Sequence, residues 1–133
     1  MAKLLADSSA FLALTDRDDR HHPSAVDFVR RNPSHRFVLT ELIVAEVATR
    51  VRARADAARA TALGASLLGG GRYELVLADV ELLRAALGRM LQLADKRLSL
   101  TDCASFELMD RLGLRTAFTF DRDFRDCGYQ MVP

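Results

Sequence analysis

The sequence predicts an α/β fold in which a parallel sheet carries helices on both faces. Short apolar segments, each long enough for one strand, alternate along the chain with longer helix-like segments. This alternation is typical of parallel strands joined by helical crossovers, and the right-handedness of such crossovers leaves few topologies to consider. With 133 residues, the chain is expected to form one domain, residues 1–133, with a substantial hydrophobic core.

The first half of the chain is predicted to contain two strands. The first is KLLA at 3–6, and SSAFLALT after the following aspartate starts like a capped helix. A serine can cap a second helix over residues 24–31, which an Asn-Pro pair ends. The second strand, at 37–40, runs directly into the helical segment ELIVAEVATRVRARA. An alanine-rich helix over about 56–68 follows, and three glycines stop it.

The second half is predicted to contain three strands. Residues 73–78 form the third strand, and an aspartate then caps the long amphipathic helix VELLRAALGRMLQLA. Another helix runs from about 99 to 112, closed by a glycine. Residues 116–120 form the fourth strand. Residues 129–132 are predicted as a fifth strand at the sheet edge, because a proline follows them.

Three acids are predicted to meet at one edge of this sheet. Asp7 and Asp121 follow two predicted strands, and Asp102 lies in the first turn of the helix that precedes the second of these strands. Ligands of open parallel sheets bind outside the carboxyl ends of the strands. Carboxylates brought together raise each other's pKa, so such a group normally binds a hard divalent cation.

Glu46 is a fourth candidate, for a different reason. It interrupts an aliphatic helical segment that should face the core, and a carboxylate buried there without a partner would be unfavourable. It also lies about a turn and a half from the end of the second strand, within reach of the same edge. Glu41 is closer to that strand, but at the helix start it has an ordinary role as a first-turn acid.

Each aspartate also has a purely structural interpretation. Asp7 can cap the helix that begins at Ser8, Asp102 can belong to a capping box with Ser99, and Asp121 can be a turn residue. These interpretations do not account for Glu46 or for the shared edge. The coincidence of all four acids therefore favours a functional site.

Composition excludes several broad classes of protein. The net charge of +1 argues against strong nonspecific attraction of the whole molecule to nucleic acid, although almost all of the positive charge is arginine. The apolar runs are too short to span a bilayer, and no secretory signal is expected. Cys103 and Cys127 fit neither a metal-binding spacing nor a disulfide framework. We therefore expect a soluble cytoplasmic protein with two reduced thiols.

These features resemble the PIN domain family, and in particular the VapC toxins of type II toxin–antitoxin modules. The resemblance covers essentially the whole chain through the segments ADSSAFLAL, TELIVAEV, SLTDCASFELM and AFTFDRDF. It implies a five-stranded parallel sheet in the order 3-2-1-4-5 and a ribonuclease that depends on Mg²⁺ or Mn²⁺. By motif position, the catalytic, metal-binding acids of the family correspond to Asp7, Glu46, Asp102 and Asp121.

Further expectations come with this resemblance. Asp123 either assists the metal site or only shapes the turn, and Ser8-Ser9 stands where a threonine followed by a serine is frequent. The implied partners are an RNA substrate and a small VapB-like antitoxin whose C-terminal segment occupies the active site. The resemblance also implies homodimerisation.

Phosphodiester cleavage requires an activated water and relief of the negative charge on the phosphoryl group, and carboxylate-bound Mg²⁺ supplies both without a histidine base. Hydroxyl groups are expected to hold a metal-bound water or a ligand carboxylate in place, and the candidates are Ser9, Thr101 and Thr119. The candidate phosphate contacts, each with a solvated or ion-paired face as the alternative, are Arg50, Arg54, Arg122 and Arg125. His21 and His22, in a charged loop, are interpreted as surface residues.

Other classes fit less well. A receiver domain requires an acidic pair after the first strand, a haloacid-type phosphatase requires Asp-x-Asp there, and a dinucleotide-binding fold requires GxGxxG; the sequence has none of these. Two alternatives stay open. One is a catalytically weak PIN domain that binds RNA or serves in assembly, and the other is a housekeeping RNA-processing nuclease.

Overall fold

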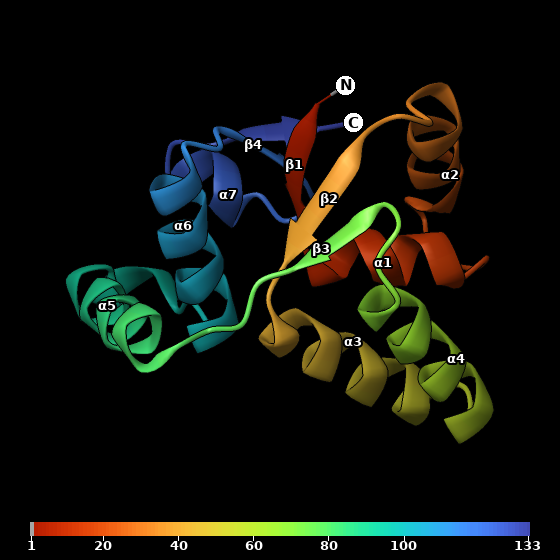
Figure 1. Cartoon of the computed structure of the whole chain (residues 1–133), viewed down its shortest axis with the longest axis horizontal. Helices are drawn as coiled ribbons and strands as arrows, with labels where there is room; N and C mark the ends of the chain where they lie inside the picture. The colour runs from red at the N-terminus through yellow and green to blue at the C-terminus, as the bar shows by residue number, and fades with distance from the viewer. Residues whose placement is uncertain (1) are drawn as a thin grey trace.

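A five-stranded parallel sheet forms the centre of the computed structural model, which describes residues 2–133 (Figure 1). The strand order is β3-β2-β1-β4-β5, and every neighbouring pair is parallel, which confirms the expected topology. β1 lies between β2 and β4, so its carboxyl end is at the topological switch point, where ligands of such sheets bind. The strands are β1 (Lys3–Ala6), β2 (Arg36–Leu39), β3 (Tyr73–Leu75), β4 (Thr116–Phe118) and β5 (Gln130–Val132).

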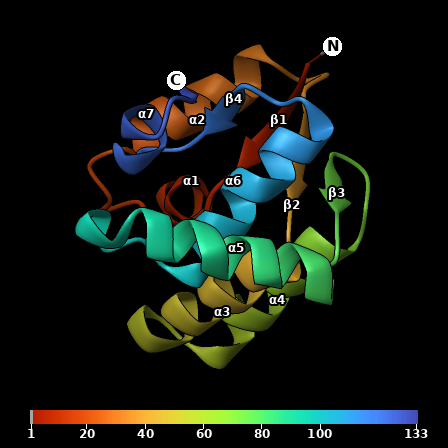
Figure 2. The same ribbon diagram turned by 90° about the vertical axis from the view of Figure 1, so that its left-hand side faces the viewer.

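Helices cover both faces of this sheet. Along β1, Leu4 and Ala6 enter one hydrophobic core and Leu5 enters the other, because successive side chains of a strand point to opposite faces. The first core lies under α1–α4 and the second under α5–α7; Figure 2 shows α5 crossing in front of α6. The helices are α1 (Ser8–Thr15), α2 (His22–Arg31), α3 (Glu41–Arg54), α4 (Ala57–Leu68), α5 (Val80–Gln92), α6 (Leu100–Leu112) and α7 (Asp123–Asp126), with a short 3₁₀ turn at Ala94–Lys96.

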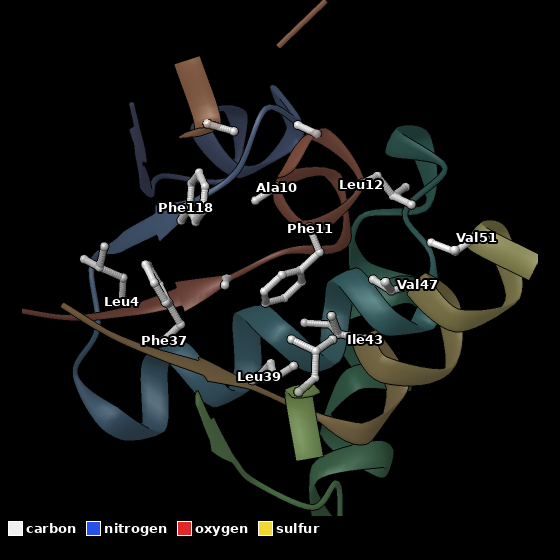
Figure 3. Close-up of a cluster of buried hydrophobic side chains, with 14 of the residues drawn as sticks. Leu4, Ala10, Phe11, Leu12, Phe37, Leu39, Ile43, Val47, Val51 and Phe118 are labelled. Atoms are coloured by element: carbon white, nitrogen blue, oxygen red, sulfur yellow. The ribbon is translucent and has the colours of Figure 1, made fainter. Parts of the chain in front are cut away.

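The first core joins the sheet to α3. Phe37 of β2 and Phe118 of β4 lie with their ring centroids 5.5 Å apart, and Phe11 of α1 points toward the same cluster (Figure 3). Ile43 and Val47 of α3 are one turn apart and fully buried. This packing fixes the roll of α3 about its axis, and therefore the direction in which its other faces point.

β3 and β4 end at least two residues earlier than predicted, because side chains replace strand partners at their ends, and β5 begins one residue later than predicted. β4 stops at Phe118, and the Phe120 N–H then donates to Ser9 Oγ at 3.0 Å. β3 stops at Leu75, and the Ala78 N–H donates to both carboxylate oxygens of Glu41, at 2.9 and 3.1 Å. Glu41 therefore secures the connection to α5, besides its expected place in the first turn of α3.

Other boundaries also differ from the prediction. α2 begins at His22 instead of residue 24, because Pro23 fits the first turn of a helix, where no N–H donor is needed. The four-residue α7 and the 3₁₀ turn were not predicted.

Cys103 and Cys127 are both free thiols. Within residues 2–133, no helix has the length and apolar character needed to cross a membrane.

Candidate metal centre

Asp7 lies at the centre of the candidate site, at the carboxyl end of β1. It occupies the N-cap position of α1 but makes no capping hydrogen bond. Instead its Oδ2 accepts hydrogen bonds from Ser9 Oγ at 2.9 Å and Thr119 Oγ1 at 3.0 Å. The side chain is only 3% exposed. Burial raises the pKa of Asp7 despite these hydrogen bonds, and the charge of Asp121 raises it further.

Asp102, Asp121 and Asp123 form a tight group beside Asp7. Each offers one carboxylate oxygen, and these oxygens all lie within 4.8 Å of one another. Asp102 projects from the first turn of α6, whereas Asp121 lies between β4 and α7 and Asp123 is the first residue of α7. The structure thus brings Asp123 into the same group as Asp121, whereas the sequence left its place open.

The ordinary structural roles of two of these acids are present as well. Asp102 Oδ2 accepts from the Ser99 N–H at 3.3 Å, and Ser99 Oγ accepts from the Asp102 N–H at 3.0 Å, which completes the capping box. Asp121 Oδ1 accepts from the Asp123 N–H at 2.9 Å and closes a turn. Each bond engages one oxygen, so the caps orient the carboxylates and leave their other oxygens available.

The electrostatics of the group connect it to Asp7. Burial, and next the charge of Asp7, raise the pKa of Asp102 to about 6. Burial and the charge of Asp121 also raise the pKa of Asp123. Each carboxylate therefore makes ionisation of its neighbours less favourable, as expected when like charges share a partly desolvated site.

Glu46 lies apart from this group, and its expected burial among aliphatic side chains is wrong. Its side chain is 23% exposed, because Ile43 and Val47 occupy the core-facing side of α3. Glu46 Oε1 accepts a 2.6 Å hydrogen bond from Ser8 Oγ, which also lies 3.5 Å from Asp7 Oδ1. Ser8 thus connects Glu46 to Asp7, while Asp7 itself adjoins the three aspartates.

The hydroxyl groups show how far local sequence predicts such contacts. Ser9 and Thr119 both contact Asp7, as expected. Within the described residues 2–133, no hydrogen bond joins Thr101 to a site carboxylate. Ser8 was not predicted, although its place between Asp7 and the first turn of α1 was a usable signal.

A groove of about 510 Å³ opens beside the acids. Its lining includes Ser9 and Asp121 from the acid site, together with Arg50 and Arg54 of α3, the two residues of this helix predicted to contact phosphates. Arg50 also pairs with Glu46, with Nη2 3.5 Å from Oε1.

The other two arginines predicted to contact phosphates lie elsewhere. Arg122 and Arg125 do not line the groove, and Arg125 instead lies 3.9 Å from a carboxylate oxygen of Asp126. Arg20 and His21 do line it, although neither was predicted to belong to the site.

The donor set fits a hard divalent cation. Within residues 2–133, no lysine or arginine forms an ion pair with Asp7 or with the three grouped aspartates. Among the described residues, the charge of Lys96 acts on Asp123 from further away, but no direct ion pair neutralises these acids. Oxygen ligands from several carboxylates are what Mg²⁺ and Mn²⁺ prefer. The residues whose oxygens lie close enough to share such an ion are Asp102, Asp121 and Asp123, and Asp7 adjoins them.

Comparisons with known proteins agree with this architecture. The sequence model of the PIN domain matches residues 4–128. Among solved structures, VapC20 of Mycobacterium tuberculosis, described as a sarcin-ricin loop cleaving toxin, has a TM-score of 0.88 at 22% identity and covers 95% of each chain. No protein of curated function matches the sequence significantly.

Two further structures are similar at lower scores. VapBC2 from Rickettsia felis, bound to a DNA fragment from its promoter, has a TM-score of 0.67 at 9% identity, covering 98% of this chain and 97% of the other. FitAcB from Neisseria gonorrhoeae has a TM-score of 0.67 at 13% identity, covering 100% and 97%. At these identities, the structural similarity establishes the fold.

Proposed function

The chain belongs to the PIN domain family, and from this premise we propose that it is a metal-dependent endoribonuclease that hydrolyses RNA phosphodiester bonds. One observation supports the proposal above all others. Asp102, Asp121 and Asp123 converge beside Asp7 at the carboxyl edge of the sheet, and within residues 2–133 none of the four forms an ion pair with a lysine or arginine. A divalent ion would supply the missing positive charge, and an open groove beside the acids would admit the nucleic acid.

A divalent ion held by these acids would relieve the charge on the phosphoryl group and would lower the pKa of water enough for it to attack at neutral pH. The protein contributes orientation. Ser9 and Thr119 hold Oδ2 of Asp7, so that Oδ1 faces away from these donors and is available as a ligand.

Glu46, which Ser8 connects to Asp7, is proposed to assist the hydrolysis. Its Oε1 is engaged by Ser8 and Arg50, which leaves Oε2 to accept a hydrogen bond from water at the reacting phosphate. Arg50 and Arg54 are proposed to contact RNA phosphates along the groove.

The purified protein is expected to cleave single-stranded RNA in Mg²⁺ or Mn²⁺ and to lose cleavage in EDTA. The reason is that removal of the ion leaves several carboxylates facing the phosphate, and like charges repel. Cleavage is followed with an end-labelled RNA on a denaturing gel, and activity is then restored by excess Mg²⁺. Full cleavage after exhaustive chelation would contradict the metal-dependent mechanism.

We further propose that this ribonuclease is the toxin of a VapBC-type module in the cytoplasm. It would act as a homodimer, and a small VapB-like antitoxin would occupy the acid site. The support is the shared fold of VapC20 and of the two complexes, together with matching lengths of chain.

Induced expression in a bacterial host is expected to arrest growth, because cleavage of RNA stops protein synthesis. Co-expression of the short open reading frame next to the gene should restore growth. The control is the same chain with Asp102→Asn, confirmed as soluble by immunoblot. Normal growth with soluble, RNA-cleaving protein would instead identify a housekeeping nuclease. Absence of cleavage, with RNA binding retained, would identify a catalytically weak RNA-binding module.

A further inference from the structure

We propose that His21 and Phe120 form a stacking platform for one unpaired RNA base next to the reacting phosphate. This inference rests on the proposed function and adds a binding site for the base to it. The two rings come from distant parts of the sequence, yet their centroids are 4.3 Å apart and their planes differ by only 9°. Both side chains are partly exposed, and both line the groove beside the acids.

The backbone of Phe120 holds the platform at a fixed position relative to the acids. Phe120 immediately precedes Asp121, and its N–H donates to Ser9 Oγ at 3.0 Å. Ser9 Oγ in turn donates to Asp7 Oδ2 at 2.9 Å. A phosphate bound at the acids would therefore place a neighbouring nucleotide over these rings.

The loop between α1 and α2 holds the other ring. The His21 N–H donates to Asp19 Oδ1 at 2.8 Å, and Arg20 Nε donates to His21 Nε2 at 3.2 Å. Asp16 also braces the loop, since its Oδ1 accepts from the Asp18 N–H at 2.9 Å. The acids of the loop are thus engaged with its own backbone.

The charges around the platform suit a single strand of RNA. Arg20, Arg50 and Arg54 line the same groove as the two rings, and the acids that line it with them are Asp16, Asp19 and Asp121. Guanidinium groups contact phosphates, while aromatic faces accept bases of any sequence by stacking. The faces of bases in a duplex are covered by their neighbours, so such a platform selects unpaired nucleotides in loops or ends.

A simpler role for the stack is to fasten the loop to the end of β4. The two roles predict different measurements. A brace would affect the unfolding temperature and the loop, whereas a platform would affect RNA affinity while the fold stays intact. Leucine fills a similar volume without an aromatic face, which makes Phe120→Leu and His21→Leu the informative variants.

Binding is measured by fluorescence anisotropy, with a labelled, unstructured RNA oligonucleotide of mixed sequence at one fixed salt concentration. All proteins carry Asp102→Asn, so that the RNA is not consumed, and Mg²⁺ is present. Phe120→Leu and His21→Leu are each expected to weaken binding about tenfold, the usual effect of removing a base–aromatic stack. Phe120→Tyr should keep the parent affinity. Tyr73→Leu, at a partly buried aromatic residue outside the groove, is the matched control and should leave affinity unchanged.

A second RNA probe distinguishes binding of the bases from binding of the sugar–phosphate backbone. An oligonucleotide of the same length made only of abasic ribose-phosphate should bind the parent more weakly, and the leucine variants should weaken its binding no further. A stack that acts only as a brace would lower the unfolding temperature of the leucine variants and leave RNA affinity at the parent value. That result would overturn the platform.

Failure of the platform and failure of the proposed function give different results. If the unsubstituted chain neither binds nor cleaves RNA, both the proposed function and the platform are wrong. If that chain cleaves RNA and the leucine variants bind RNA like the parent, only the platform is overturned. If the leucine variants are no longer inhibited by the antitoxin but bind RNA like the parent, the rings contact a side chain of the antitoxin instead. That result would also overturn the proposal.

Discussion

Replacing Asp102 with asparagine is expected to reduce RNA cleavage at least about a hundredfold while the protein stays folded, because a proposed metal ligand is lost. The substitution keeps an oxygen that can accept the Ser99 N–H, so the capping box at the start of α6 survives. It also removes a carboxyl group whose ionisation is made unfavourable by burial and by the charge of Asp7. The unfolding temperature in EDTA should therefore be equal to or higher than that of the parent.

Cleavage rates are compared under saturating Mg²⁺, and folding is followed by circular dichroism. Asp95→Asn is the matched control, because Asp95 is an exposed acid in the 3₁₀ turn just before α6 and its replacement makes the same change in charge. Asp7→Asn should behave like Asp102→Asn. Parental activity in folded Asp102→Asn protein would remove this carboxylate from the proposed metal site.

The second large effect is a dependence of metal binding and stability on pH. The pKa of Asp102 is about 6 in the folded protein, against an ordinary value of 3.8. Between these values the folded state binds more protons than the unfolded state, so the metal-free protein loses stability as the pH rises from about 4 to about 6. After allowance for solvent screening, this single group contributes about 1–2 kcal/mol of the loss. Burial raises the pKa of Asp7 and Asp123 as well, which acts in the same direction.

A divalent ion reverses this trend, because it binds the deprotonated carboxylates. Its apparent affinity should fall about tenfold per pH unit below pH 6 for each proton displaced. Mg²⁺ should therefore raise the unfolding temperature strongly at about pH 7.5 and little at about pH 4.5. Thermal scans in EDTA measure how the stability of the metal-free protein depends on pH, and scans in Mg²⁺ measure the stabilisation by the ion. Comparison with the Asp102→Asn protein gives the contribution of the Asp102 carboxylate to each. Equal stabilisation by Mg²⁺ at both pH values would contradict binding at the acids.

The sequence predicted the strands and the acids at their ends because both depend on local patterns. Apolar runs marked the strands, and the acids followed them directly, as with Asp7 and Asp121. Once the strand order is known from the family resemblance, parallel pairing places the ends of β1 and β4 side by side. No long-range information beyond the topology is needed for this part of the site.

The sequence could not predict features that depend on how helices roll or how loops fold back. Glu46 belongs to an almost continuous aliphatic stretch, so periodicity could not show that Ile43 and Val47 would take the core side and leave Glu46 partly exposed. The stack between His21 and Phe120 joins a polar loop to the end of a strand, and neither segment carries a local signal for the other. α7 has only four residues, too few for an amphipathic pattern.

The hydrogen bond from Thr119 to Asp7 has a consequence for how the protein is made. These two residues are separated by 112 positions, and the grouped acids Asp121 and Asp123 follow Thr119. During synthesis, the residues that orient and complete the acid of β1 emerge from the ribosome more than a hundred residues after it. A nascent chain therefore lacks the assembled site until Thr119 and the two acids that follow it have been made.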